Sequence, residues 1–131
     1  MCGIVGIVGD SSVAKRLIEG LRRLEYRGYD SAGIAVVQSD GALERCRAAG
    51  KISNLVQAHR TSGVDGQVGI AHTRWATHGG PTDENAHPHL GDGGKLALIH
   101  NGIIENFSEL KAELTERGHT FSSETDTEVA A

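Results

Sequence analysis

The sequence predicts an α+β fold in which strands and helices form layers around an apolar core. Short apolar runs bounded by turn residues are typical of strands, and longer segments with apolar residues at helical spacing are typical of helices. The 131 residues are 38% hydrophobic, which is enough for a core. A chain of this length forms one small domain or a part of a larger one.

Apolar segments between turn residues predict the strands. The expected strands are residues 3–8, 32–38, 42–48, 67–72 and 95–100, with a further short one at 119–122. The first of them, GIVGIV, contains no polar residue and is expected to be buried. The second and third are separated by Ser39-Asp40-Gly41, so they are expected to form a hairpin. A polar stretch at 73–94 is long for a compact domain, and such loops are often functional.

The first two helices are predicted by apolar residues at helical spacing. Asp10 and Ser11 are candidate N-caps of a helix that runs to about Tyr26. Its apolar positions are Val13, Leu17, Ile18, Leu21 and Leu24. A second, short amphipathic helix is expected over residues 52–59.

Two more helices are predicted near the end of the chain. Ser108 is a candidate N-cap of a helix that ends at Gly118. Thr125 followed by Glu128 has the pattern of a capping box, so a fourth helix is expected to start there. Because this helix begins so close to residue 131, the chain is expected to be the first part of a domain.

The composition argues against several classes of function. The formal net charge of −4 disfavours non-specific binding to nucleic acid or to an anionic membrane. No apolar run approaches the ~20 residues of a membrane span, and the N-terminus lacks the basic flank of a signal peptide. Cys2 and Cys46 are too few for a disulfide scaffold, so Cys46 is expected to be a reduced thiol and the protein cytoplasmic.

The start Met1-Cys2-Gly3 makes Cys2 a candidate nucleophile. Initiator methionine is usually removed when the next residue is small, and removal leaves an α-amino group and a thiol on one residue. An α-amine titrates at ~7.7–8.0, so it can act as the base that activates the thiol. The alternative is that Cys2 is a small apolar residue at the head of a buried strand.

Two polar segments carry candidate binding residues. In residues 25–33 (EYRGYDSAG), Arg27 could lower the pKa of the Cys2 thiol, or it could simply stabilise the end of a helix. In residues 72–80 (HTRWATHGG), Arg74 can grip the α-carboxylate of an amino acid while Thr and His add further donors. The alternatives for this second segment are a surface loop or a zinc site. The histidines available for zinc are His72, His78, His87 and His89, which lack compact ligand spacing.

Asn101 and Gly102 follow the expected strand at 95–100. The Asn101 side-chain amide and the Gly102 backbone N–H could form an oxyanion hole, in which each donor is typically worth ~10²–10³ in rate. The alternative is a plain Asn-Gly hairpin turn.

Six motifs occur together and in a fixed order. They are MCGIVGIVG, LEYRGYDSAGIAV, AHTRWATHG, NAHPH, HNGIIENF and SETDTEV. Over essentially the whole chain, they resemble the N-terminal glutaminase domain of the glutamine–fructose-6-phosphate aminotransferase (isomerising) family, also called glucosamine-6-phosphate synthases. Such domains are class II glutamine amidotransferases with the four-layer αββα fold of N-terminal nucleophile (Ntn) hydrolases. Residues 1–131 are expected to be an incomplete portion of that fold.

The resemblance implies a role for each matching position. Cys2 would attack the side-chain amide of L-glutamine, release ammonia and form a γ-glutamyl thioester that water hydrolyses, with its own α-amine as the base. Asn101 and Gly102 would form the oxyanion hole. The residues implied in substrate binding are Arg74, Trp75, Thr77, His78 and Asp126, with Arg27 in support near Cys2. The resemblance implies no cofactor and no metal.

In the family, sugar isomerase domains follow the glutaminase domain, and they are absent from this chain. They bind fructose 6-phosphate and use the ammonia to make glucosamine 6-phosphate. The resemblance also implies a homodimer when the protein is full-length, with no nucleic-acid or membrane partner. The alternatives are a truncated, non-catalytic module that binds glutamine or another protein, and a different class II amidotransferase.

Overall fold

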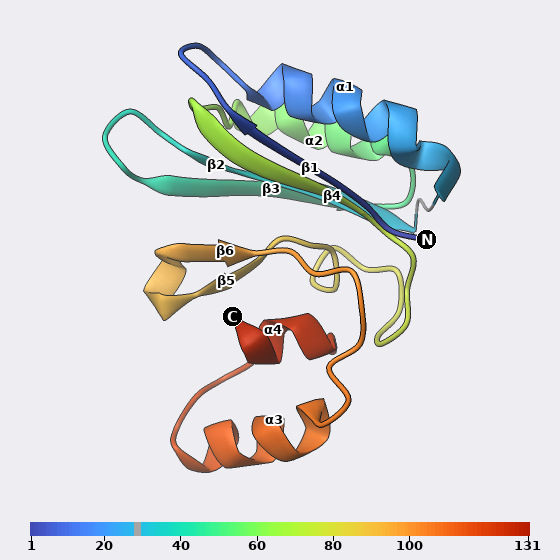
Figure 1. Ribbon diagram of the computed structural model, residues 1–131, viewed down its shortest axis with the longest axis vertical. Helices are drawn as coiled ribbons and strands as arrows, with labels where there is room; N and C mark the ends of the chain where they lie inside the picture. The colour runs from blue at the N-terminus through green and yellow to red at the C-terminus, as the bar shows by residue number, and fades with distance from the viewer. Residues whose placement is uncertain (28–29) are drawn as a thin grey trace.

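The computed structural model describes residues 1–27 and 30–131, which form four layers (Figure 1). Helices α1 and α2 cover one face of a four-stranded sheet, the β5–β6 hairpin lies on the other side, and α3 and α4 form the outer layer beyond it. The strands are β1 (Gly3–Val8), β2 (Ser31–Val37), β3 (Leu43–Ala49), β4 (Val68–Arg74), β5 (His89–Gly91) and β6 (Leu96–Leu98). The helices are α1 (Ala14–Leu24), α2 (Ile52–Ser62), α3 (Phe107–Glu116) and α4 (Asp126–Ala130), with 3-10 turns at Glu25–Arg27 and Asp92–Gly94. The α+β expectation is therefore confirmed.

The large sheet has the strand order β1-β4-β2-β3, and every neighbouring pair is antiparallel. This order places β1 at an edge, so the expectation that residues 3–8 are buried is wrong. Val5 and Ile7 pack against the core, whereas Ile4 and Val8 are 45% and 83% exposed. An edge strand that is covered on one face alone alternates in this way, even when every residue is apolar.

The core lies between the large sheet and its two helices. Leu17 and Leu21 of α1 meet Ile34 of β2, and Ile52 and Leu55 of α2 complete the cluster. All five side chains are almost completely buried. Each such burial stabilises the fold by about 1.5–3 kcal/mol, so this layer forms a rigid support for the strand ends.

The start of α1 differs from the prediction. The helix begins at Ala14 rather than after Asp10 and Ser11, and neither of those side chains caps it. Instead Asp65, distant in sequence, accepts a hydrogen bond from the Ala14 N–H at 3.1 Å and another from the Ser12 hydroxyl. The cap is therefore tertiary, which local spacing could not indicate.

The C-terminal elements confirm two predictions and contradict two others. Thr125 Oγ1 accepts from the Glu128 N–H at 3.4 Å, which confirms the cap of α4. Gly118 (φ +93°) ends α3 in the left-handed region, as expected. Ser108, however, lies inside α3, whose N-cap is Asn106. Residues 119–122 form no strand, since the Ser122 N–H donates to the Glu128 carboxylate rather than to a neighbouring strand.

The polar stretch 73–94 contains a strand that the sequence did not predict. β5 pairs with β6 in the register His89–Leu98, and β6 is shorter than the expected strand 95–100. The hairpin formed by β2 and β3 and the helix α2 are confirmed. Within residues 1–27 and 30–131, no helix is both long enough and apolar enough to cross a membrane.

Candidate active site

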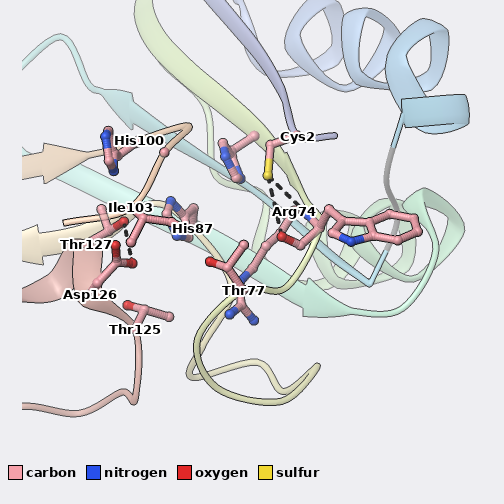
Figure 2. A pocket seen from close by; sticks show the side chains of 12 residues that line it. Cys2, Arg74, Thr77, His87, His100, Ile103, Thr125, Asp126 and Thr127 are labelled. Atoms are coloured by element: carbon pink, nitrogen blue, oxygen red, sulfur yellow. Dashed lines mark hydrogen bonds between the residues drawn. The ribbon is translucent and has the colours of Figure 1, made fainter. Parts of the chain in front are cut away.

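A cavity of about 250 Å³ opens beside Cys2, between the large sheet and α4 (Figure 2). Predicted site residues from four separate segments line it. They are Cys2, Arg74, Trp75, Thr77, Gly102 and Asp126. The fold therefore brings most of the predicted site together around one space.

The Cys2 thiol is held by the chain that follows β4. The Trp75 backbone N–H donates to Cys2 Sγ at 3.2 Å, and Sγ lies 3.7 Å from the Trp75 carbonyl oxygen. These two contacts fix the position of the sulfur beside the backbone of Trp75. Gly3 allows this position, because a Cβ there would lie 2.8 Å from Thr73 Oγ1 and 2.9 Å from Leu24 Cβ.

Asp30 fixes the backbone around Trp75. One of its carboxylate oxygens accepts from the Ala76 N–H, and the other accepts from the Ser31 hydroxyl at 2.9 Å. The Asp30 N–H also donates to the Arg74 carbonyl at 3.2 Å. Asp30 was not selected from the sequence as a site residue, so its positioning of the backbone beside Cys2 was missed.

Arg74 is buried, with 3% of its surface exposed, and organises the loop that follows it. Its Nη1 donates to the Gly80 carbonyl at 3.0 Å, and its Nη2 donates to the carbonyls of Gly79, at 3.2 Å, and His78. Three of its five N–H groups are used in this way, and Arg74 is among the residues that line the cavity. The contact of Arg74 with a substrate carboxylate stays a prediction.

The remaining residues of this loop lie at different depths. Thr77 lines the cavity, whereas the His78 ring packs edge-on against Phe107 with ring centroids 4.8 Å apart. His78 Nδ1 lies 3.3 Å from Thr77 Oγ1, so its imidazole supports the wall from behind. The Trp75 side chain is 60% exposed at the rim.

The Asn101-Gly102 segment lies directly beside the nucleophile. Asn101 Nδ2 donates to the Cys2 carbonyl at 3.3 Å, and Gly102 lines the cavity. β6 is followed by a bend and then by α3, so the alternative of a plain hairpin turn is wrong.

Asp126 lies on the opposite side of the cavity from Cys2 (Figure 2). It is the first residue of α4 and is 3% exposed. Its Oδ2 accepts from the Ile104 N–H at 2.6 Å, which ties α4 to the loop that carries Gly102. Asp126 and Arg74 thus line the same cavity.

Arg27 lies beside the N-terminus rather than in the wall of the cavity. Its carbonyl oxygen accepts a hydrogen bond from the Met1 ammonium group, and its Nη2 is 3.9 Å from Met1 Sδ. Residues 28 and 29 of the same motif lie outside the described part of the chain.

Three buried histidines form a column next to the cavity. The His72 and His87 rings stack with centroids 4.3 Å apart at 14°, and the His89 ring meets His87 edge-on at 4.7 Å. Burial lowers the pKa of His72 and of His89 to about 4, and that of His87 to about 2, so all three are neutral at pH 7. Among the residues that the structure describes, no three His, Cys, Asp or Glu side chains are placed to bind a metal ion.

Several residues of the cavity wall were not assigned to it from the sequence. They are His72, His87, His100, Ile103, Thr125 and Thr127. The available signal was the position of these residues inside the AHTRWATHG, NAHPH, HNGIIENF and SETDTEV motifs.

Comparisons with known proteins agree with this geometry. A family model described as a glutamine amidotransferase domain matches residues 47–131. The chain is 64% identical over 139 residues to a glutamine–fructose-6-phosphate aminotransferase (isomerizing) of Corynebacterium diphtheriae, covering 100% of this chain and 22% of that protein. It is 60% identical over 131 residues to a protein of the same name from Zymomonas mobilis, covering 100% of this chain and 21% of that protein. The chain thus spans about a fifth of the length of these curated relatives.

Solved structures of amidotransferases share the fold. The glutamine phosphoribosylpyrophosphate amidotransferase of B. subtilis aligns with a TM-score of 0.81 at 32% identity, covering 98% of this chain and 28% of that one. A structure described as the allosteric regulatory enzyme of purine biosynthesis aligns with a TM-score of 0.81 at 35% identity and the same coverage. With the relatives above, these alignments confirm both the αββα Ntn-hydrolase fold and the resemblance carried by the sequence motifs.

Proposed function

The chain belongs to the glutamine amidotransferase domain family, and on that premise we propose that Cys2 hydrolyses the side-chain amide of L-glutamine. The products are glutamate and ammonia. The observation that carries this proposal is the Cys2 thiol, which lies at the wall of a 250 Å³ cavity with the Trp75 N–H directed at its sulfur. A cysteine nucleophile requires a sulfur that is held in place at a cavity large enough to admit its substrate.

The reaction begins when Cys2 Sγ attacks the amide carbon of glutamine. The thiol proton passes to the α-amine of Cys2, which then protonates the departing nitrogen so that ammonia leaves. A γ-glutamyl thioester remains on Cys2, and water attacks it to release glutamate and restore the thiol. This base exists only after Met1 is removed, because Cys2 nitrogen is otherwise part of a peptide bond.

Asn101 and Gly102 supply the oxyanion hole in this proposal. The Asn101 amide already points its NH₂ group toward the Cys2 backbone at 3.3 Å, and the neighbouring Gly102 lines the cavity. Negative charge that develops on the amide oxygen would be stabilised by these two donors.

The charges around the cavity fit the two ends of an α-amino acid. Arg74 would bind the α-carboxylate, with Thr77, His78 and Trp75 shaping that side, and Asp126 across the cavity would bind the α-ammonium group. Arg27, whose carbonyl oxygen accepts from the Met1 ammonium group before Met1 is removed, would lie near the new N-terminus at Cys2.

Residues 1–131 would form the N-terminal part of a class II glutaminase domain. We further propose that a longer polypeptide uses the ammonia to convert fructose 6-phosphate to glucosamine 6-phosphate in sugar isomerase domains, and that it is a homodimer in the cytoplasm. The names of the relatives and their greater length support a longer polypeptide that acts on fructose 6-phosphate.

Ammonia release from glutamine tests the proposal. The full-length gene product, with Met1 removed, is compared with its Cys2→Ala variant and with Cys46→Ala, which removes the buried thiol of β3. We expect Cys46→Ala to retain activity and Cys2→Ala to lose it by at least about 10³-fold. An active Cys2→Ala enzyme contradicts the proposal, and glutamine binding without turnover by the parent would favour the non-catalytic module.

A further inference from the structure

We propose that His72 is a positioning residue, whose Nε2–H holds the Oδ1 end of Asn101 so that the amide NH₂ faces the reacting carbonyl beside Cys2. The inference rests on the proposed function, because it assigns a role to His72 within the same oxyanion hole. It starts from a 2.7 Å hydrogen bond between His72 Nε2 and Asn101 Oδ1.

The positions of the hydrogens on His72 and Asn101 follow from the atoms that each side chain contacts. The Cys2 carbonyl oxygen is an acceptor, so the end of Asn101 that lies 3.3 Å from it is the NH₂ group. The other end, Oδ1, is also an acceptor, so His72 Nε2 must carry a hydrogen. Because His72 is neutral at pH 7, that hydrogen is its only ring proton and Nδ1 has none. In the described part of the chain, His72 Nδ1 is buried without a hydrogen-bond partner.

His72 is itself rigidly held, so it can fix the position of another side chain. It lies on the central strand β4, in register with Ile4 of β1 and Gly33 of β2, and it is fully buried. Its ring stacks almost parallel on the His87 ring. By contrast, Asn101 is exposed and lies in a bend, so its own backbone supplies little restraint.

The same column of rings reaches the other side of the cavity. His87 meets His89 of β5, and His89 Nε2 lies 2.8 Å from Thr125 Oγ1, the N-cap of the helix that begins with Asp126. His72 therefore anchors Asn101 to a structure that also positions α4.

An amide without this anchor can rotate and present Oδ1, which repels a developing oxyanion. Misplacing a catalytic group lowers the rate of the chemical step rather than the affinity for the ground state. For His72→Phe, which keeps a stacking ring but has no donor, we expect kcat to fall by ~10–100-fold. The loss should not exceed that of Asn101→Ala. KM for glutamine should stay within about threefold, because the contacts that bind glutamine in the ground state are unchanged.

A double-mutant cycle on the full-length gene product, with Met1 removed, tests the proposal. We expect the double variant His72→Phe/Asn101→Ala to be no slower than Asn101→Ala alone, and His72→Gln, which can still donate, to recover part of the rate. His119→Phe, the same substitution at an exposed histidine outside the cavity, should match the parent. An unchanged kcat in His72→Phe, or an equal further loss in the Asn101→Ala background, would overturn the proposal.

The ring protonation of His72 provides a second measurement if His72→Phe does not fold. Nitrogen NMR of the parent at pH 7 should show His72 protonated at Nε2 and not at Nδ1, and the opposite tautomer would overturn the proposal. A parent that folds but releases no ammonia would refute the proposed function instead, while the NMR result would still decide whether His72 can hold Asn101.

Discussion

The backbone N–H of Trp75 is directed at the Sγ atom of Cys2, 3.2 Å away, although the two residues are separated by 73 positions in the sequence. Cys2 precedes the first residue of β1 and Trp75 follows the last residue of β4, and the two strands are antiparallel neighbours in the register Gly3–Thr73, so both residues lie at the same end of this strand pair. The sheet therefore brings the candidate nucleophile to the loop that carries Arg74 and Thr77.

Gly3→Ala should impair activity, because the new Cβ would lie 2.8 Å from Thr73 Oγ1 and 2.9 Å from Leu24 Cβ. The strand must shift to relieve these contacts, and it carries Cys2 with it. We expect kcat for glutamine hydrolysis to fall by at least about tenfold. Gly6→Ala on the same strand is the matched control, since a Cβ there meets no atom within 4 Å. Equal activity of the two variants would refute this account of Gly3.

Gly33→Ala should destabilise the fold. A Cβ at Gly33 would overlap the carbonyl oxygen of His87 and would lie 2.9 Å from Arg47 Cγ. Such overpacking typically costs about 1–3 kcal/mol, so the midpoint of urea unfolding should fall while Gly6→Ala leaves it nearly unchanged. An unaltered midpoint would show that the loop carrying His87 adapts freely.

Asp65→Ala should weaken the N-terminus of α1. The carboxylate accepts from the Ala14 N–H and the Ser12 hydroxyl, and loss of an N-cap acceptor costs about 1 kcal/mol. Chemical unfolding measures this change, with Asp10→Ala as the control because Asp10 does not cap the helix. A larger effect from Asp10→Ala would contradict the tertiary cap.

Acid should destabilise the folded state through the histidine column. The folded-state pKa is lowered by burial to about 4 for His72 and His89 and to about 2 for His87, below the ~6.5 of an unfolded chain. Between these pH values the unfolded chain binds more protons than the folded one. The contribution of the three neutral histidines to the free energy of unfolding is therefore complete above pH 6.5 and is lost as the pH falls below it.

Unfolding free energies at pH 7.5 and 5.5 measure this effect before the carboxylates titrate. Each histidine contributes a slope of up to about 1.4 kcal/mol per pH unit below its unfolded pKa. His87→Phe should reduce the difference between the two pH values, whereas His119→Phe, at an exposed site, should leave it unchanged. A difference that is the same in all three proteins would contradict the role of the column.

Much of the fold was accessible from local patterns. Apolar periodicity predicted α2 and the hairpin of β2 and β3, because both depend on residues close in sequence. The exposure of β1 and the cap at Asp65 were not accessible, since each depends on which distant segment lies alongside. β5 was missed because it is only three residues long, His89–Gly91, and lies inside a stretch that is polar as a whole.

The residues of the candidate site also fall into those that the sequence could predict and those that it could not. Cys2, Arg74 and Asn101 could be selected because their side chains have recognisable chemistry within motifs. The histidines offered the same signal but were considered only as metal ligands, and their stacking depends on the tertiary contact of β4 with the chain at His87. These histidines act by positioning other residues through tertiary contacts, which motifs alone do not reveal.

The most direct test of the central claim is to detect the acyl-enzyme. The protein with Met1 removed is mixed with glutamine, quenched in acid during turnover, digested and analysed by mass spectrometry. A γ-glutamyl group on the peptide that begins with Cys2, absent when Met1 is retained, is the predicted result. Turnover of glutamine with the adduct on another residue, or with a Cys2→Ala protein as fast as the parent, would contradict it.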